Sequence, residues 1–176
     1  MIRAVRAEWT KVRTLPGAFW LLAASAVAAA FGRTGAQIGQ VAIVALAVLA
    51  IGNEYATGLI RLTLTAMPNR LAVFVSKLVV IAALTAVTGT RQALYLTLIA
   101  VYSLGLAAVL RDTAGAVTTV LATLFVTPLL ARVIDDPEWQ RRLTTFSPMT
   151  ASPGVLAGYA AVAALAGALC LRFRDA

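Results

Sequence analysis

Long uninterrupted apolar runs constrain this chain more than any other feature of its sequence. A helix needs about 20 apolar residues, within a range of about 17–25, to cross the hydrocarbon core of a bilayer. Runs close to that length occupy about residues 15–32, 36–53, 71–89, 93–110, 114–131 and 154–171. Backbone groups in lipid must be hydrogen-bonded within the protein, and the strands of a barrel would give short alternating segments instead. The sequence therefore predicts six transmembrane helices.

The composition agrees with a membrane protein. Hydrophobic residues make up 61% of the chain and charged residues 12%, whereas soluble domains have about 45–50% and 25%. A soluble domain of this size could not bury that much apolar surface. We therefore predict an all-α integral membrane protein with a single transmembrane domain over residues 1–176.

The net charge of +8 predicts membrane topology better than it predicts nucleic-acid binding. The cations flank apolar runs, and nucleic-acid binders instead gather them on a soluble surface beside recognisable motifs. Cytoplasmic loops are enriched in Lys and Arg. With a cytoplasmic N-terminus, ten cations face the cytoplasm: Arg3, Arg6, Lys11, Arg13, Arg61, Arg70, Lys77, Arg111, Arg172 and Arg174. Five face outside: Arg33, Arg91, Arg132, Arg141 and Arg142. This asymmetry predicts a multi-pass protein of the cell membrane with both termini in the cytoplasm.

The N-terminal segment, residues 1–14, has the pattern of an amphipathic helix. Its larger apolar residues recur at helical spacing: Ile2, Val5, Trp9 and Val12. Its charged residues occupy the other faces: Arg3, Arg6, Glu8, Lys11 and Arg13. An apolar stripe with a Trp among cations favours a helix in the membrane interface, anchored by Trp9. An ordinary basic flank before the first span is an equally good interpretation.

A polar stretch, GNEYATGLIRLTLTAMPNR at residues 52–70, interrupts the apolar runs. Helix connections in bundles usually take about 2–8 residues, so this one is longer than a reversal of direction requires. We expect Thr57 to cap a short helix that begins near Gly58, and Pro68 to stop it. Its apolar residues share one face: Ile60, Leu64 and Met67. An ordered helix under the bilayer would suit a partner, and the alternative is a solvated turn.

Several motifs resemble one family. The pattern Glu54-x3-Gly58-x2-Arg61, followed by Pro68-x-Arg70 and Lys77, is similar to the type-2 class of bacterial ATP-binding-cassette (ABC) export permeases. The segments AEWTKVRT (7–14), VLRDTAGAV (109–117) and LRFRDA (171–176) resemble the same family.

The resemblance implies what the polar stretch does. In that family a cytoplasmic coupling helix between spans two and three docks on a separate ATPase subunit. By resemblance, Glu54, Gly58, Arg61, Pro68 and Arg70 would lie at this contact. A second permease chain, identical or different, would complete the membrane-spanning unit.

The sequence lacks residues and motifs that many enzymes and ATP-binding proteins use. The sequence has no His and no G-x-x-x-x-G-K-[ST] motif, so it lacks the commonest metal ligand and a phosphate-binding loop. Its carboxylates are scattered, so we expect no enzyme activity, metal or cofactor in this chain.

The remaining candidate for an intramembrane charge is Lys77, which lies near the cytoplasmic end of its run. We expect its amine to snorkel to the membrane surface as an interfacial anchor. The sequence thus favours the permease subunit of an ABC exporter with an unidentified cargo. The alternatives are a secondary transporter without an ATPase partner and a membrane scaffold that transports nothing.

Overall fold

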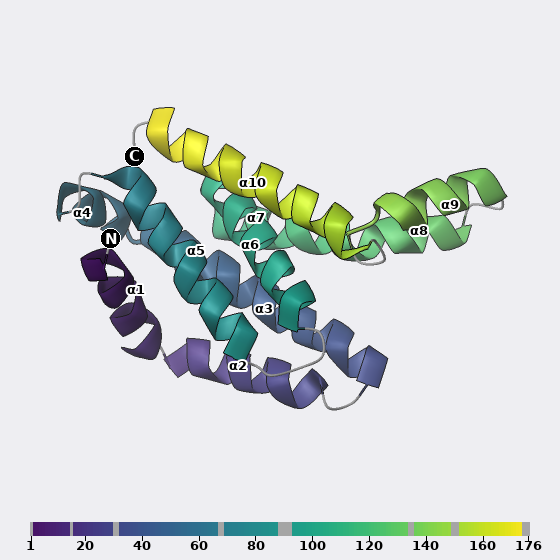
Figure 1. Cartoon of the computed structure of the whole chain (residues 1–176), viewed down its shortest axis with the longest axis horizontal. Helices are drawn as coiled ribbons and strands as arrows, with labels where there is room; N and C mark the ends of the chain where they lie inside the picture. Colours follow the sequence, from purple (N-terminus) through teal and green to yellow (C-terminus); the bar gives the residue numbers. More distant parts are fainter. Residues whose placement is uncertain are drawn as a thin grey trace.

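The computed structural model describes residues 2–14, 16–29, 32–66, 69–87, 93–133, 136–148 and 152–173. All regular structure in these ranges is helical (Figure 1). The helices are α1 (Ile2–Thr14), α2 (Pro16–Ala29), α3 (Gly32–Ala56), α4 (Leu59–Ala66), α5 (Arg70–Val87), α6 (Ala93–Leu110), α7 (Thr113–Leu121), the π-helical η1 (Ala122–Val126), α8 (Thr127–Val133), α9 (Pro137–Phe146) and α10 (Pro153–Phe173).

Four helical segments of the described ranges are long and apolar enough to cross a membrane. They are Gln37–Ala56, Ala93–Leu110, Thr113–Leu130 and Pro153–Phe173. The predicted all-helical architecture is confirmed for the described residues, and four of its helices are candidates for the predicted membrane spans. The other two predicted spans fall on α2, whose described apolar part is the shorter Phe19–Ala28, and on α5, which is not among the four.

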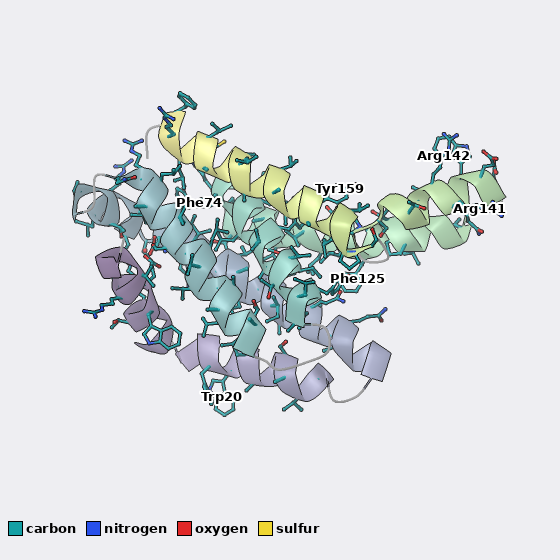
Figure 2. All side chains as sticks on the ribbon, viewed as in Figure 1. Trp20, Phe74, Phe125, Arg141, Arg142 and Tyr159 are labelled. Atoms are coloured by element: carbon teal, nitrogen blue, oxygen red, sulfur yellow. The ribbon has the colours of Figure 1, made fainter. Side chains whose placement is uncertain are left out.

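Helix α6 lies at the centre of the bundle and packs against α3, α5, α7 and α10. Helix α2 lies along α3, and α1 lies against α5. Phe74 of α5 is buried in the core (Figure 2), whereas Trp20 of α2 points away from the bundle. The start of α1, the end of α10 and α4 lie at one end of the molecule, and α9, which carries Arg141 and Arg142, lies at the other.

A close helix contact joins the backbones of α6 and α10. A Cβ added to Gly105 would lie 2.5 Å from the carbonyl carbon of Ala163, and one added to Gly167 would lie 2.9 Å from the carbonyl oxygen of Gly105. Small residues allow helices in a membrane to approach this closely and to gain van der Waals contact along their backbones. Gly105, Ala163 and Gly167 therefore fix where α10 crosses α6.

The π-helical turn η1 interrupts one long helix that runs from Thr113 to Val133. Pro128 follows η1 by two residues and has no N–H with which to bond the carbonyl of Leu124. Its ring would also clash with that carbonyl in a regular α-helix. A widened turn just before a proline separates the two groups, so Pro128 gives η1 a local cause.

A residue at Gly105 larger than glycine should disrupt the bundle. Because the carbonyl of Ala163 belongs to a backbone that cannot shift cheaply, we expect Gly105→Val to lower the free energy of unfolding by about 1–3 kcal/mol or more. Gly158→Val is the matched control, since a Cβ there meets nothing within 4 Å. Unfolding in mixed micelles with increasing dodecyl sulfate, followed by circular dichroism, measures both, and equal stability of the two variants would contradict the packing.

Candidate functional site

Four charged side chains form a cluster where α1, α3 and α5 meet. The Lys77 amine donates to Glu8 Oε2 at 2.7 Å and to Glu54 Oε1 at 2.8 Å. The Lys11 amine donates to the same Glu54 oxygen at 2.7 Å and to Glu8 Oε1 at 3.1 Å. We call these four residues the ion cluster.

Each member reaches the ion cluster because of its place on a helix. Glu54 lies in the last turn of α3, which continues to Ala56 and not, as predicted, to about residue 53. Lys77 lies on the second turn of α5, and Glu8 lies midway along α1, the helix packed against α5. Lys11 is three residues after Glu8, so both side chains face the same side of α1.

The ion cluster is buried and electrically balanced. The side chain of Lys77 is only 2% exposed, and its third hydrogen bond goes to the carbonyl of Ala50 at 3.3 Å. All three donors of this amine therefore have acceptors. Two carboxylates and two amines sum to zero charge, and that balance offsets part of the large cost of removing charges from water.

Lys11 is the solvent-facing member, with a side chain that is 41% exposed. Burial on its own would lower the pKa of Lys11, but its hydrogen bond to Glu54 and the charges of Glu54 and Glu8 together raise that pKa above 10.5. A raised pKa means that the contribution of Lys11 to stability is fully present below its ordinary pKa. That contribution is lost as the pH rises through the raised value.

The structure corrects two expectations about these residues. The Lys77 amine does not extend to the membrane surface: it lies inside the bundle, because two carboxylates and a carbonyl there satisfy its charge better than a long reach to the surface would. Glu54, which by resemblance would lie at the contact with an ATPase subunit, is buried within this chain. Its position in the last turn of α3, one residue beyond the predicted end of the span, brings it against Lys77.

Helix α1 also differs in part from the amphipathic pattern. Trp9 is 48% exposed, as an anchor in the interface would be, but Glu8 is buried and faces α5. The sequence placed Glu8 among the outward charges, since its buried partner, Lys77, lies 69 residues away along the chain. One sequence signal for the ion cluster was available: its two cations are the two lysines of a chain whose other cations are all Arg.

The turn between α3 and α4 depends on Gly58, whose φ is +70°. Thr57 does not cap α4, because its hydroxyl donates to the Asn53 carbonyl at 2.6 Å and so belongs to α3. Gly58 takes the capping position, and its carbonyl accepts from the Arg61 N–H at 3.2 Å. Thr57 does not occupy the capping position of α4, because Gly58 adopts the left-handed geometry that ends α3.

Helix α4 is anchored on one face and open on the other. Ile60 is buried, in agreement with the predicted apolar face, whereas the other two members of that face, Leu64 and Met67, lie outside the described side chains. Arg61, Leu62 and Thr65 are exposed.

The last predicted contact residues are Arg70 and Pro68. The Arg70 guanidinium donates to the carbonyl of Leu171 at 3.3 Å and so joins the start of α5 to the end of α10. Pro68 lies outside the described residues. The structure thus brings Glu54 together with Lys77, whereas Arg61 and Arg70 point to different surroundings.

A cavity of about 450 Å³ adjoins the ion cluster. Its polar lining comes from the ion cluster and from Asn53, Thr57 and Thr63, and its apolar lining from Leu49, Ala50, Leu59, Leu62, Val80 and Ile81. Glu54 Oε2 is buried and has no hydrogen-bond partner among the described residues. Among the described residues, no group of three or more His, Cys, Asp or Glu side chains is placed to hold a metal ion.

The chain matches none of the protein-family models, curated proteins or solved structures with which it was compared. We therefore infer the function from the geometry of the ion cluster, the cavity and α4.

Removing the buried amine should destabilise the protein far more than removing the exposed one. Lys77→Met leaves two buried carboxylates facing each other, and breaking a buried ion pair from one side costs about 3–5 kcal/mol. Lys11→Met should cost about 0–1 kcal/mol, because its side chain is partly in water. The unfolding titration described above measures both, and a Lys77→Met variant as stable as Lys11→Met would contradict the ion cluster.

Gly58 should resist substitution for a backbone reason. Its surroundings are open, so crowding does not arise, but its φ of +70° is unfavourable for any residue with a Cβ. We expect Gly58→Ala to lose about 1–2 kcal/mol of unfolding free energy. Gly17→Ala, at an open position in α2, should gain up to about 1 kcal/mol. A stable Gly58→Ala variant in the same titration would show that the turn does not need left-handed geometry.

Proposed function

We propose that this chain is the membrane-spanning permease subunit of an ABC exporter, with six transmembrane helices, both termini and α4 in the cytoplasm, and an ATPase subunit bound in trans. The motif resemblance supports the family. The observation that carries the proposal is α4, a short helix between two bundle helices, α3 and α5, with an exposed face formed by Arg61, Leu62 and Thr65. A polar turn needs no such face, whereas a docking helix does.

In this proposal α4 transmits motion of the ATPase to the bundle. Ile60 is buried under α4, and α3 continues into α4 through the two-residue turn at Thr57 and Gly58. The ion cluster joins the end of α3 to α5 and α1. A push on α4 would therefore move these three helices as one group against α6 and α10, a rigid-body switch between two states.

A secondary transporter is the second candidate, and one observation favours it. Glu8, Glu54 and Lys77 are buried ionisable residues beside a cavity, and such residues in membrane proteins commonly carry protons or ions. The complete pairing of Lys77 favours a structural role for that residue. This candidate predicts ion flux through the chain without any ATPase.

Purification from native membranes in mild detergent tests the proposal. We expect a second polypeptide with a phosphate-binding loop in fixed stoichiometry, together with ATP hydrolysis by the complex. Arg61→Glu should reduce its recovery at least about ten-fold, because reversing a charge in an interface costs several kcal/mol. Thr65→Ser is the matched control, since the serine hydroxyl can still donate to the Leu62 carbonyl as Thr65 does at 2.9 Å.

The absence of an ATP-hydrolysing partner from the wild-type preparation would contradict the proposal, as would full recovery with Arg61→Glu. A parallel measurement addresses the second candidate: the chain alone is reconstituted into vesicles that contain a pH-sensitive dye. Proton entry driven by an imposed membrane potential, and abolished in Lys77→Met, would favour secondary transport.

A further inference from the structure

The cavity beside the ion cluster has the properties of a small-molecule site. Its volume of about 450 Å³ falls in the range of about 300–1,000 Å³ typical of ligand pockets. Two of its lining residues, Leu59 and Leu62, are exposed, so the cavity is reachable from outside the bundle. Most of its wall is apolar, with the polar groups gathered at the ion cluster.

One carboxylate oxygen of Glu54, a residue that lines this cavity, lacks a hydrogen-bond donor. Glu54 Oε1 accepts from both Lys77 and Lys11, but Glu54 Oε2 is buried without a partner among the described residues. A buried carboxylate oxygen without a donor is costly. The three donors of the Lys77 amine are already committed to Glu8, Glu54 and Ala50. A donor group on a molecule that enters the cavity, which Glu54 lines, would supply the missing hydrogen bond.

We propose that this cavity binds an uncharged amphiphile that has an apolar body and one hydroxyl or amide donor directed at Glu54 Oε2. The apolar body would lie against Leu49, Val80 and Ile81, which line the cavity. An uncharged head group fits because the ion cluster is already balanced. An ammonium or a phosphate would place a net charge among buried groups, at a large desolvation cost.

This site adjoins the proposed docking surface but does not depend on an ATPase partner. Arg61 and Thr65 do not line the cavity, although Leu62 borders both regions. Ligand binding to the chain alone can therefore fail or succeed independently of the permease proposal.

Photolabelling tests the site directly. The purified chain in phosphatidylcholine vesicles is labelled with dodecanol that carries a diazirine on its alkyl chain, and the modified peptides are located by mass spectrometry. We expect adducts on the cavity segments of α3 and α5, in preference to the exposed face of α10. Excess dodecanol should compete at least about ten-fold better than dodecyl methyl ether, because the ether has no donor for the buried carboxylate.

Three variants locate the interaction. Leu49→Trp, which adds bulk at the cavity wall, should reduce cavity labelling at least about ten-fold, whereas Leu169→Trp, at an exposed position on α10 that does not line the cavity, should leave it unchanged. Glu54→Met removes the acceptor and should abolish the preference for alcohol over ether. If Glu54→Met does not fold, the alcohol–ether comparison in the wild-type protein and the Leu49→Trp variant still decide the outcome.

The source of the amphiphile is distinguished by adding dioleoylglycerol to the vesicles. Competition by this lipid, which carries a free hydroxyl, identifies a bilayer component as the ligand class. Competition by dodecanol without competition by dioleoylglycerol identifies a smaller amphiphile. Equal competition by alcohol and ether, labelling spread evenly over the lipid-facing helices, or undiminished labelling of Leu49→Trp would overturn the proposal.

Discussion

The described arrangement of α1, α3 and α5 depends on the ion pairs of the buried Lys77 amine. This amine binds Glu8 from α1 and Glu54 from α3, and Lys11 links the same two carboxylates on the solvent side. In a membrane, apolar surface alone does not drive helices together, because lipid is as apolar as leucine. A buried ion cluster has one low-energy arrangement, so it specifies which helices meet, even where its net contribution to stability is modest.

The other half of the bundle is held by a different device. Helices α6 and α10 meet through backbone contact at Gly105, Ala163 and Gly167. The bundle thus combines a polar contact near the end that holds α4 with close apolar packing along α6. In the proposed function the first would receive motion from α4, and the second would provide the surface against which that motion occurs.

Local sequence determined a large part of the architecture. Long apolar runs must become helices in lipid because their backbone groups have no other partner, and this physical rule predicted the four long apolar helices. The polar stretch predicted a short helix that begins near Gly58, and this helix is α4, which begins at Leu59. Local patterns were less exact at helix ends: α3 continues three residues past its predicted limit of about residue 53, and the first of these residues, Glu54, lies inside the bundle.

Local sequence is therefore enough to predict which segments are helical and apolar, and where the chain turns. Which charges meet depends on how the helices pack. Neighbours within one helical turn predict that Glu8 is one of several outward charges of an amphipathic helix. They likewise predict that the Lys77 amine snorkels to the membrane surface. The pairing of Glu8 with Lys77 depends on α1 packing against α5 across 69 residues of chain. Likewise, Gly154-x3-Gly158 matches the pattern of a close helix contact as well as Ala163-x3-Gly167 does, yet Gly158 meets nothing and Gly167 meets α6, because contact depends on helix placement, which no local pattern contains.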